Sequence, residues 1–212
     1  KYNVKLNLDK VIITLKAMRE YLLPIVKITS YFKSINSKQD LQKFIQQRSA
    51  HITQNTLYGY LKTRMGHKYT IMVDDDVYSK SINIAKWNIY LTALADCTFY
   101  TFSYLVDKKN LKEIEAEKVF FSILENEKIN GLDITLFEQA KIEFQKRNKE
   151  VDWKNFHSQT PFKLSGLALH RWAPISENLK ILDKDIVLNS IDLKWNLVEN
   201  EFKEMTKNLN FN

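Results

Sequence analysis

The sequence predicts an all-α protein: a single-domain bundle of six or seven helices around a central apolar helix at about 76–106, with long second and last helices. Only 4 Gly and 3 Pro occur in 212 residues, which leaves little turn chemistry for short strands. Apolar side chains recur at helical intervals over most of the chain. Because 44% of the residues are hydrophobic, one sizeable core can form, and we expect one domain over 1–212.

The first third of the chain is strongly basic. Residues 1–73 contain 13 Lys and Arg against 3 Asp and Glu, within a formal net charge of +7 for the whole chain. We expect basic N-terminal helices over 1–66, the first at about 8–32, where Pro24 kinks or splits it because proline lacks a backbone donor. Such a positive surface attracts polyanions or acidic partners. The alternative is a solvated, lysine-bearing face without a partner.

The second helix has signals at both of its ends. Ser37 is a suitable N-cap, Asp40 places negative charge in the first turn, and Gly66 ends the helix. A helix between these signals has about 28 residues and spans roughly 42 Å.

The segment after this helix contains the residues that most resemble a chemical site. Three consecutive aspartates, Asp74–Asp76, follow His67 in the stretch RMGHKYTIMVDDD. Aspartates at a helix start accept hydrogen bonds from free N–H groups and complement the helix dipole. Neighbouring residues on a helix fan out by about 100° each, so they share a magnesium ion poorly. We therefore expect the aspartates to cap the central helix, and His67 to lie on a flexible linker without a catalytic role.

The central helix is apolar on all sides. From 87 to 106 the only charged residue is Asp96. An all-round apolar helix must be buried by protein or by lipid. Polar residues interrupt the run, and a central carboxylate is costly in a bilayer, so we expect a protein core and no transmembrane span.

Two residues in this helix are candidates for chemistry. An ionised Asp96 inside a core needs a partner, and Arg48 and Arg64 on the preceding helix are the nearest plausible ones. We expect a structural ion pair, with a catalytic carboxylate as the alternative. Cys97 is expected to be a buried thiol and not a nucleophile. As the only cysteine, it fits a reducing compartment.

The remaining sequence predicts three helices and one irregular link. An amphipathic helix at about 111–128 leads to an Asn130–Gly131 turn, and Asp133 caps the next helix. Residues 151–175 have no clean period and contain two prolines and a glycine, so they are expected to form an irregular link 151–175 over the surface. The C-terminal long helix, 176–208, has apolar residues that step by four and three: Ile191, Trp195, Val198, Phe202 and Met205.

No motif for a catalytic, cofactor-binding or metal-binding site is present, so no such residue is predicted. There is no phosphate-binding loop, dinucleotide-binding turn or nucleophile elbow. Aromatic residues interleaved with the basic ones of the first third raise RNA as a partner, although helical tyrosine is more often core or interface. The histidines, which share no metal-ligand spacing, are His51, His67, His157 and His170.

Three stretches carry a resemblance to a known family: QNTLYGYLKTRMG at 54–66, DDDVYSKSINIAKWNIYLTALAD at 74–96 and RWAPISENLKILDKDIVLNSIDLKW at 171–195. Together they resemble an uncharacterised all-helical family associated with alphaproteobacteria. The resemblance covers about a third of the chain and includes no catalytic signature. It implies a bacterial cytoplasmic protein, or a mitochondrial descendant that has joined a larger assembly. The first residue, Lys1 in place of methionine, and the basic first third favour the second option.

These observations predict a non-catalytic accessory or scaffold subunit of a larger mitochondrial assembly, of respiratory-chain, ATP synthase or ribosome type. We expect it in the matrix or at the matrix face of the inner membrane, docked through its basic helices and exposed aromatic residues. The alternative is a protein whose basic third contacts RNA or anionic lipid headgroups. An enzyme acting through Asp74–Asp76, His67 or Asp96 ranks last.

Overall fold

The computed structural model describes residues 34–209, apart from the side chain of Val73. The chain divides into two units, residues 1–34 and 35–212, and the fold described below is that of the second. The helix expected at 8–32 and its kink at Pro24 lie outside the described residues, so a single domain over 1–212 stays a prediction.

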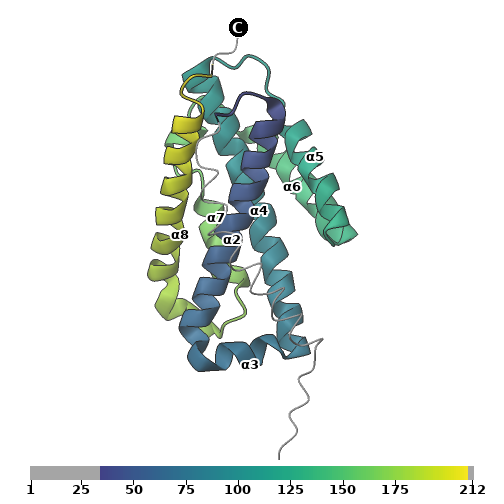
Figure 1. Ribbon diagram of the computed structural model, residues 1–212, viewed down its shortest axis with the longest axis vertical. Helices are drawn as coiled ribbons and strands as arrows, with labels where there is room; N and C mark the ends of the chain where they lie inside the picture. Colours follow the sequence, from purple (N-terminus) through teal and green to yellow (C-terminus); the bar gives the residue numbers. More distant parts are fainter. Residues whose placement is uncertain (1–33, 210–212) are drawn as a thin grey trace, which may run out of the picture. The chain divides into compact units, whose positions relative to one another are not determined.

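The described part is an all-α bundle without strands, as predicted (Figure 1). Six helices have ten residues or more within residues 34–209, and α3 and two 3-10 turns connect them. The elements in chain order are α2 (Lys38–Met65), η2 (Gly66–Lys68), α3 (Tyr69–Val73), α4 (Asp76–Lys109), α5 (Ala116–Ile129), α6 (Ile134–Glu150), η3 (Phe156–Ser158), α7 (Lys163–Trp172) and α8 (Glu177–Met205).

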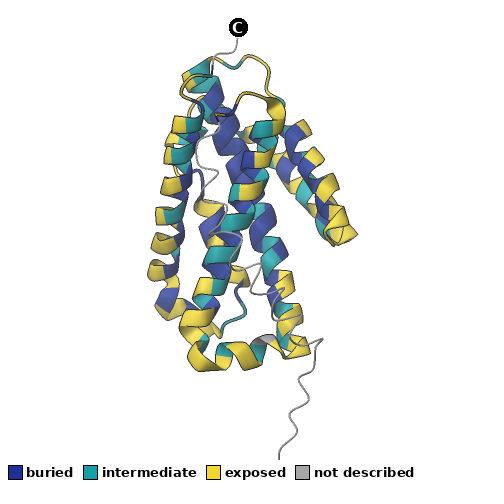
Figure 2. Ribbon diagram, in the orientation of Figure 1, coloured by how far each residue is buried: buried dark blue, intermediate teal, exposed yellow. Residues whose placement is uncertain are grey.

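Helix α4 is the centre of the bundle. It contacts α2, α3, α5, α6, α7 and η3, and its residues from 93 to 103 are all buried (Figure 2). Protein therefore covers the apolar segment, as the sequence predicted. None of the helices within residues 34–209 is long and apolar enough to cross a membrane.

Helix α2 begins and ends where the sequence predicted. The Ser37 hydroxyl accepts a hydrogen bond from the Asp40 amide at 3.1 Å, which satisfies one free N–H group of the first turn. At the other end the chain leaves the helix through Gly66, whose φ of +51° favours glycine. Helix α3 then connects α2 to the start of α4 (Figure 1).

Helices α5 and α6 form a hairpin against α4 (Figure 1). Asp133 accepts hydrogen bonds from the Thr135 and Leu136 amides, which confirms it as the N-cap of α6. An aromatic cluster joins the three helices. The ring of Phe144 stacks on Phe99 and Phe120, with centroid distances of 4.5 and 4.1 Å.

The predicted start of the first helix of this hairpin, at about 111, was wrong. Helix α4 ends at Asn110, which adopts a left-handed conformation with φ of +55°, and the Leu111 amide bonds back to the Leu105 carbonyl at 3.1 Å. This arrangement terminates α4 and turns the chain. Residues 111–115 are consequently not helical, and α5 begins at Ala116.

The prediction of an irregular link over 151–175 was also wrong. The segment contains η3 and the ten-residue helix α7, which packs against both α4 and α8. Gly166 permits the close approach of α7 to α8. A Cβ atom at this position would lie 3.1 Å from Leu188 Cδ2 and 3.4 Å from Ile191 Cγ2. Beside it, the rings of Phe162 and Trp195 stack with their centroids 4.0 Å apart.

Helix α8 confirms the predicted long last helix. Its apolar residues Ile191, Trp195, Val198 and Phe202 are buried, and Met205 packs partly buried against the core. Two arginines of α2 hold α8 in an antiparallel arrangement. Arg48 pairs with Glu201 near the end of α8, and Arg64 pairs with the buried Asp183 near its start.

Candidate functional site

The three aspartates have the structural role that the sequence predicted. Asp75 is the N-cap of α4 and accepts a hydrogen bond from the Tyr78 amide at 2.8 Å. Asp74 ends α3, and Asp76 is the first residue of α4. All three are exposed. Within residues 34–209, no group of three histidine, cysteine or acidic side chains is arranged to hold a metal ion.

The four histidines lie on separate elements. His51 is on α2, and His170 is on α7. The exposed His67, which was expected on a flexible linker, lies in the 3-10 turn η2 between α2 and α3. His157 lies in η3 and contacts both a hydroxyl and a carboxylate of α4.

Asp96 forms the buried ion pair that we expected, but with a different arginine. Its Oδ1 atom accepts a hydrogen bond from Arg147 of α6 at 2.6 Å. Its Oδ2 atom accepts bonds from the Ser165 amide at 2.8 Å and the Ser165 hydroxyl at 2.6 Å. Arg48 and Arg64 are not the partners, because both bind carboxylates of α8. Burial raises the pKa of the Asp96 carboxyl, and the Arg147 charge and the Ser165 bonds oppose this shift.

Ser165 lies in the first turn of α7, so Asp96 caps this helix from α4. Phe162 stands at the N-cap position of α7 and supplies no side-chain hydrogen bond. At the opposite end, the buried Lys180 ammonium donates a hydrogen bond to the Arg171 carbonyl at 2.8 Å. A negative charge at the N-terminus and a positive charge at the C-terminus both complement the dipole of α7.

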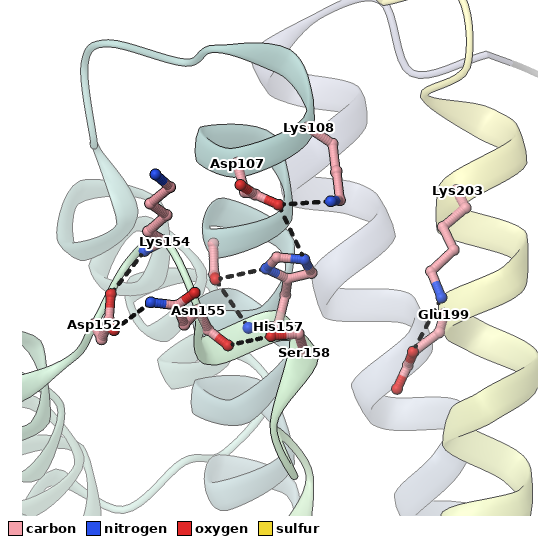
Figure 3. A network of polar contacts seen from close by, with 10 residues as sticks. Asp107, Lys108, Asp152, Lys154, Asn155, His157, Ser158, Glu199 and Lys203 are labelled. Atoms are coloured by element: carbon pink, nitrogen blue, oxygen red, sulfur yellow. Dashed lines mark hydrogen bonds and ion pairs between the residues drawn. The ribbon is translucent and has the colours of Figure 1, made fainter.

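A serine, a histidine and an aspartate meet between α4 and η3, and sequence reasoning did not find them. His157 Nδ1 lies 3.2 Å from the Ser103 hydroxyl, and His157 Nε2 lies 3.5 Å from Asp107 (Figure 3). The spacing of Ser103 and Asp107 on one helix face was the available signal. The sequence contains no signal for the position of His157, because η3 falls in the segment that was predicted to be irregular.

This group resembles a hydrolytic triad in composition but not in accessibility. The Ser103 side chain is fully buried, and its hydroxyl also accepts a hydrogen bond from the His157 amide at 2.9 Å. A nucleophile must reach a substrate carbonyl, and a hydroxyl enclosed in this way does not. Burial also lowers the pKa of His157, which favours the neutral ring. The three residues therefore hold η3 against α4.

Cys97 is a fully buried thiol, as expected. Burial raises its pKa to about 12, so almost no thiolate forms at neutral pH. Three of the six Lys and Arg residues in 34–73 form ion pairs within the described part of the chain. Its Arg48, Arg64 and Lys38 side chains pair with Glu201, Asp183 and Glu115, respectively.

One small pocket lies at the end of the bundle where α2 starts. Its volume is about 170 Å³, below the roughly 300 Å³ at which pockets for small molecules begin. Its size suits a single apolar side chain more than a cofactor. Apolar residues form most of its wall: Ile35, Leu41, Phe102, Leu105, Leu111 and Leu209.

The outer face of α8 is the most unusual surface feature of the described residues. Four aliphatic side chains there, which we call the α8 stripe, are exposed by 66–74%: Leu182, Ile186, Leu193 and Leu197. At about 100° per residue they fall within roughly 60° of one another. They lie opposite the buried face of α8 that contains Ile191 and Val198, and Figure 2 shows exposed segments along the outer side of this helix.

An apolar outer face is unexpected on a surface helix, whose solvent side is normally polar. Single exposed aliphatic residues need no explanation, but several on one face of a helix mark a contact surface. The α8 stripe is therefore the candidate functional site.

Comparison of the chain with protein-family models, with curated proteins and with solved structures gave no match.

Proposed function

We propose that this protein is a non-catalytic helical scaffold or accessory subunit that assembles with protein partners through the α8 stripe. The observation that carries the proposal is the pair of apolar faces on one helix. Val187 and Ile191 face the core, while Ile186 and Leu193 face solvent. A partner that covers the outer face completes the burial of α8.

Burial of this surface contributes favourable free energy to association. Burying an exposed aliphatic side chain contributes about 1–2 kcal/mol, and the stripe offers four side chains that are each at least 66% exposed. Part of this energy offsets the loss of translational and rotational freedom on binding. The stripe therefore supports a moderate interaction, which neighbouring contacts can strengthen.

The polar residues that sequence reasoning offered for catalysis support the non-catalytic part of the proposal. Asp75 caps α4, Asp96 joins α4, α6 and α7, and Cys97 is a buried thiol with a raised pKa. Within residues 34–209, the contacts and burial of these three side chains are those of structural residues.

The proposed setting is the mitochondrial matrix or the matrix face of the inner membrane, with the bacterial cytoplasm as the alternative. Support for it comes from the family resemblance and from the basic first third. RNA contact stays a second prediction, carried mainly by residues 1–33, since three of the basic side chains of α2 are paired inside the fold.

Affinity purification of the tagged full-length chain tests the proposal. The test variant combines Ile186→Ser with Leu193→Ser. The control combines Ile181→Ser with Ile142→Ser, because these residues are equally exposed, by 71% and 66%, but lie outside the stripe. We expect proteins that bind the wild-type chain to be depleted at least about tenfold on the test variant and retained on the control. Equal recovery by all three chains contradicts the proposal.

A further inference from the structure

We infer that the α8 stripe binds a second copy of this chain, with the two α8 helices packed antiparallel about a two-fold axis. This inference rests on the proposed function, since it names the partner of the same surface. The two-fold arrangement is the commonest symmetry of soluble oligomers and requires a self-complementary patch.

The spacing of the stripe provides that complementarity. Its residues are separated by four, seven and four positions, and this order reads the same in both directions. When one α8 is reversed against another, Leu182 faces Leu197 of the partner subunit, and Ile186 faces the partner's Leu193. Every aliphatic side chain then meets another one. The antiparallel arrangement also aligns the helix dipoles favourably.

Two polar residues occupy the midpoint of the stripe. Asn189 and Ser190 are exposed and lie between Ile186 and Leu193. In the reversed pair they fall at the two-fold axis, where an amide and a hydroxyl can exchange hydrogen bonds with their copies. A single polar residue in an apolar helix contact fixes its register. The midpoint therefore favours one alignment of the two helices over shifted ones.

The size of the contact indicates a weak dimer. Four aliphatic residues from each copy form a small contact, whereas specific interfaces usually bury more than about 1,000 Å² in total. We expect dissociation constants in the micromolar range, so that monomer and dimer coexist at ordinary laboratory concentrations.

The flanking charges predict how salt affects the dimer. Asp185 and Asp192 are exposed on one flank of the stripe and form no ion pair within residues 34–209. A two-fold axis perpendicular to the helices places the same flank of both copies together, so the carboxylates of the two chains repel. Added salt screens this repulsion and should tighten the dimer. A different partner helix with basic residues on its flank would instead bind more weakly as salt rises.

Analytical ultracentrifugation of the full chain tests the inference directly. We expect a monomer–dimer equilibrium that shifts toward dimer at high salt. Ile186→Ser with Leu193→Ser should raise the dissociation constant at least about tenfold, while Ile181→Ser should leave it unchanged. A dimer that Ile181→Ser weakens as much as the stripe variant overturns the inference.

Cysteine cross-linking tests the orientation. In the antiparallel pair, a mixture of Leu182→Cys and Leu197→Cys chains should form the mixed disulfide on mild oxidation. Neither variant should cross-link to itself, because the two positions lie roughly 22 Å apart along the helix, and a disulfide requires Cα atoms within about 7 Å. The native Cys97 is fully buried and does not compete. Self-linked Leu182→Cys dimers overturn the antiparallel arrangement.

The failure of this inference and that of the proposed function have different signatures. If the chain is monomeric at every concentration while the stripe variant loses a different protein, the second copy is excluded and the proposed function stands. If the stripe variant changes neither self-association nor partner recovery, both are excluded.

Discussion

Asp96 and Ser165 lie 69 residues apart in the chain, yet the carboxylate of one accepts both the amide and the hydroxyl of the other, at 2.8 and 2.6 Å. Because the second Asp96 oxygen binds Arg147, one buried side chain links α4, α6 and α7. This is the structural role of Asp96, the only charged residue between 87 and 106 in the apolar part of α4.

Replacing Asp96 with asparagine should therefore be strongly destabilising. The variant removes the negative charge and leaves Arg147, whose side chain is 17% exposed, without its ionic partner. We expect the free energy of unfolding to fall by about 3 kcal/mol or more, measured by urea denaturation. Glu125→Gln is the control, because this exposed glutamate pairs with Lys128 on the surface and should contribute less than about 1 kcal/mol. Similar losses in the two variants would argue against a buried ion pair.

Lys180→Met should loosen the C-terminal end of α7. Methionine keeps the apolar stem but loses the ammonium group that donates to the Arg171 carbonyl. We expect a loss of about 1–2 kcal/mol and faster amide hydrogen exchange in the last turn of α7, near Ala173. Lys184→Met, at an exposed position of α8, should change neither quantity. Exchange that accelerates equally in all helices would instead indicate global destabilisation.

Two glycines should respond to alanine in opposite directions. Gly59 lies inside α2, and Gly66 has a φ of +51°; an added Cβ meets nothing within 4 Å at either position. The two substitutions should therefore differ in their effect on stability because of the backbone conformation at each glycine, not because of steric contacts. Gly59→Ala should stabilise the protein by about 0.5–1 kcal/mol, and Gly66→Ala should destabilise it by about 1 kcal/mol. Thermal and urea unfolding measure both changes in stability. Two changes in the same direction would contradict the explanation.

Stability should decline in alkali in part because of Cys97. Burial raises the pKa of this thiol from 9.0 to about 12, so the folded state holds the proton more tightly than the unfolded state. The resulting stability is present below pH 9 and is lost as the pH rises from about 9 to about 12. Between pH 8 and pH 10 the wild-type chain should lose roughly 1 kcal/mol more than Cys97→Ala. Urea denaturation at both pH values measures this difference. An equal loss of stability in the wild-type chain and in Cys97→Ala would contradict the prediction.

The sequence predicted the elements whose signals are local. Ser37, Asp75 and Asp133 cap the helices that follow them, and Gly66 ends α2. These signals need only a few neighbouring residues, and the apolar run of α4 is long enough to predict burial without knowledge of its neighbours.

Helix α7 was missed because its stabilising contacts are not local. Its caps come from Asp96 and Lys180, which lie on other helices, and Gly166 is needed for packing against α8 and not for a turn. The partner of Asp96 was wrong for a related reason. Proximity in sequence favoured Arg48 and Arg64, but buried and half-buried carboxylates of α8 bind both. The α8 stripe was present in the sequence, yet it was recognised only once the structure showed which face of α8 is buried.

The charges that cap α7 predict that this helix forms late in folding. A ten-residue helix is marginal by itself in water, and this one has no side-chain cap of its own. It becomes favourable only after α4 and α8 have brought a carboxylate to its first turn and an ammonium to its last. Ser165→Ala should accordingly speed unfolding while leaving the refolding rate nearly unchanged in stopped-flow experiments. We therefore expect α7 to be the last helix to pack into the bundle.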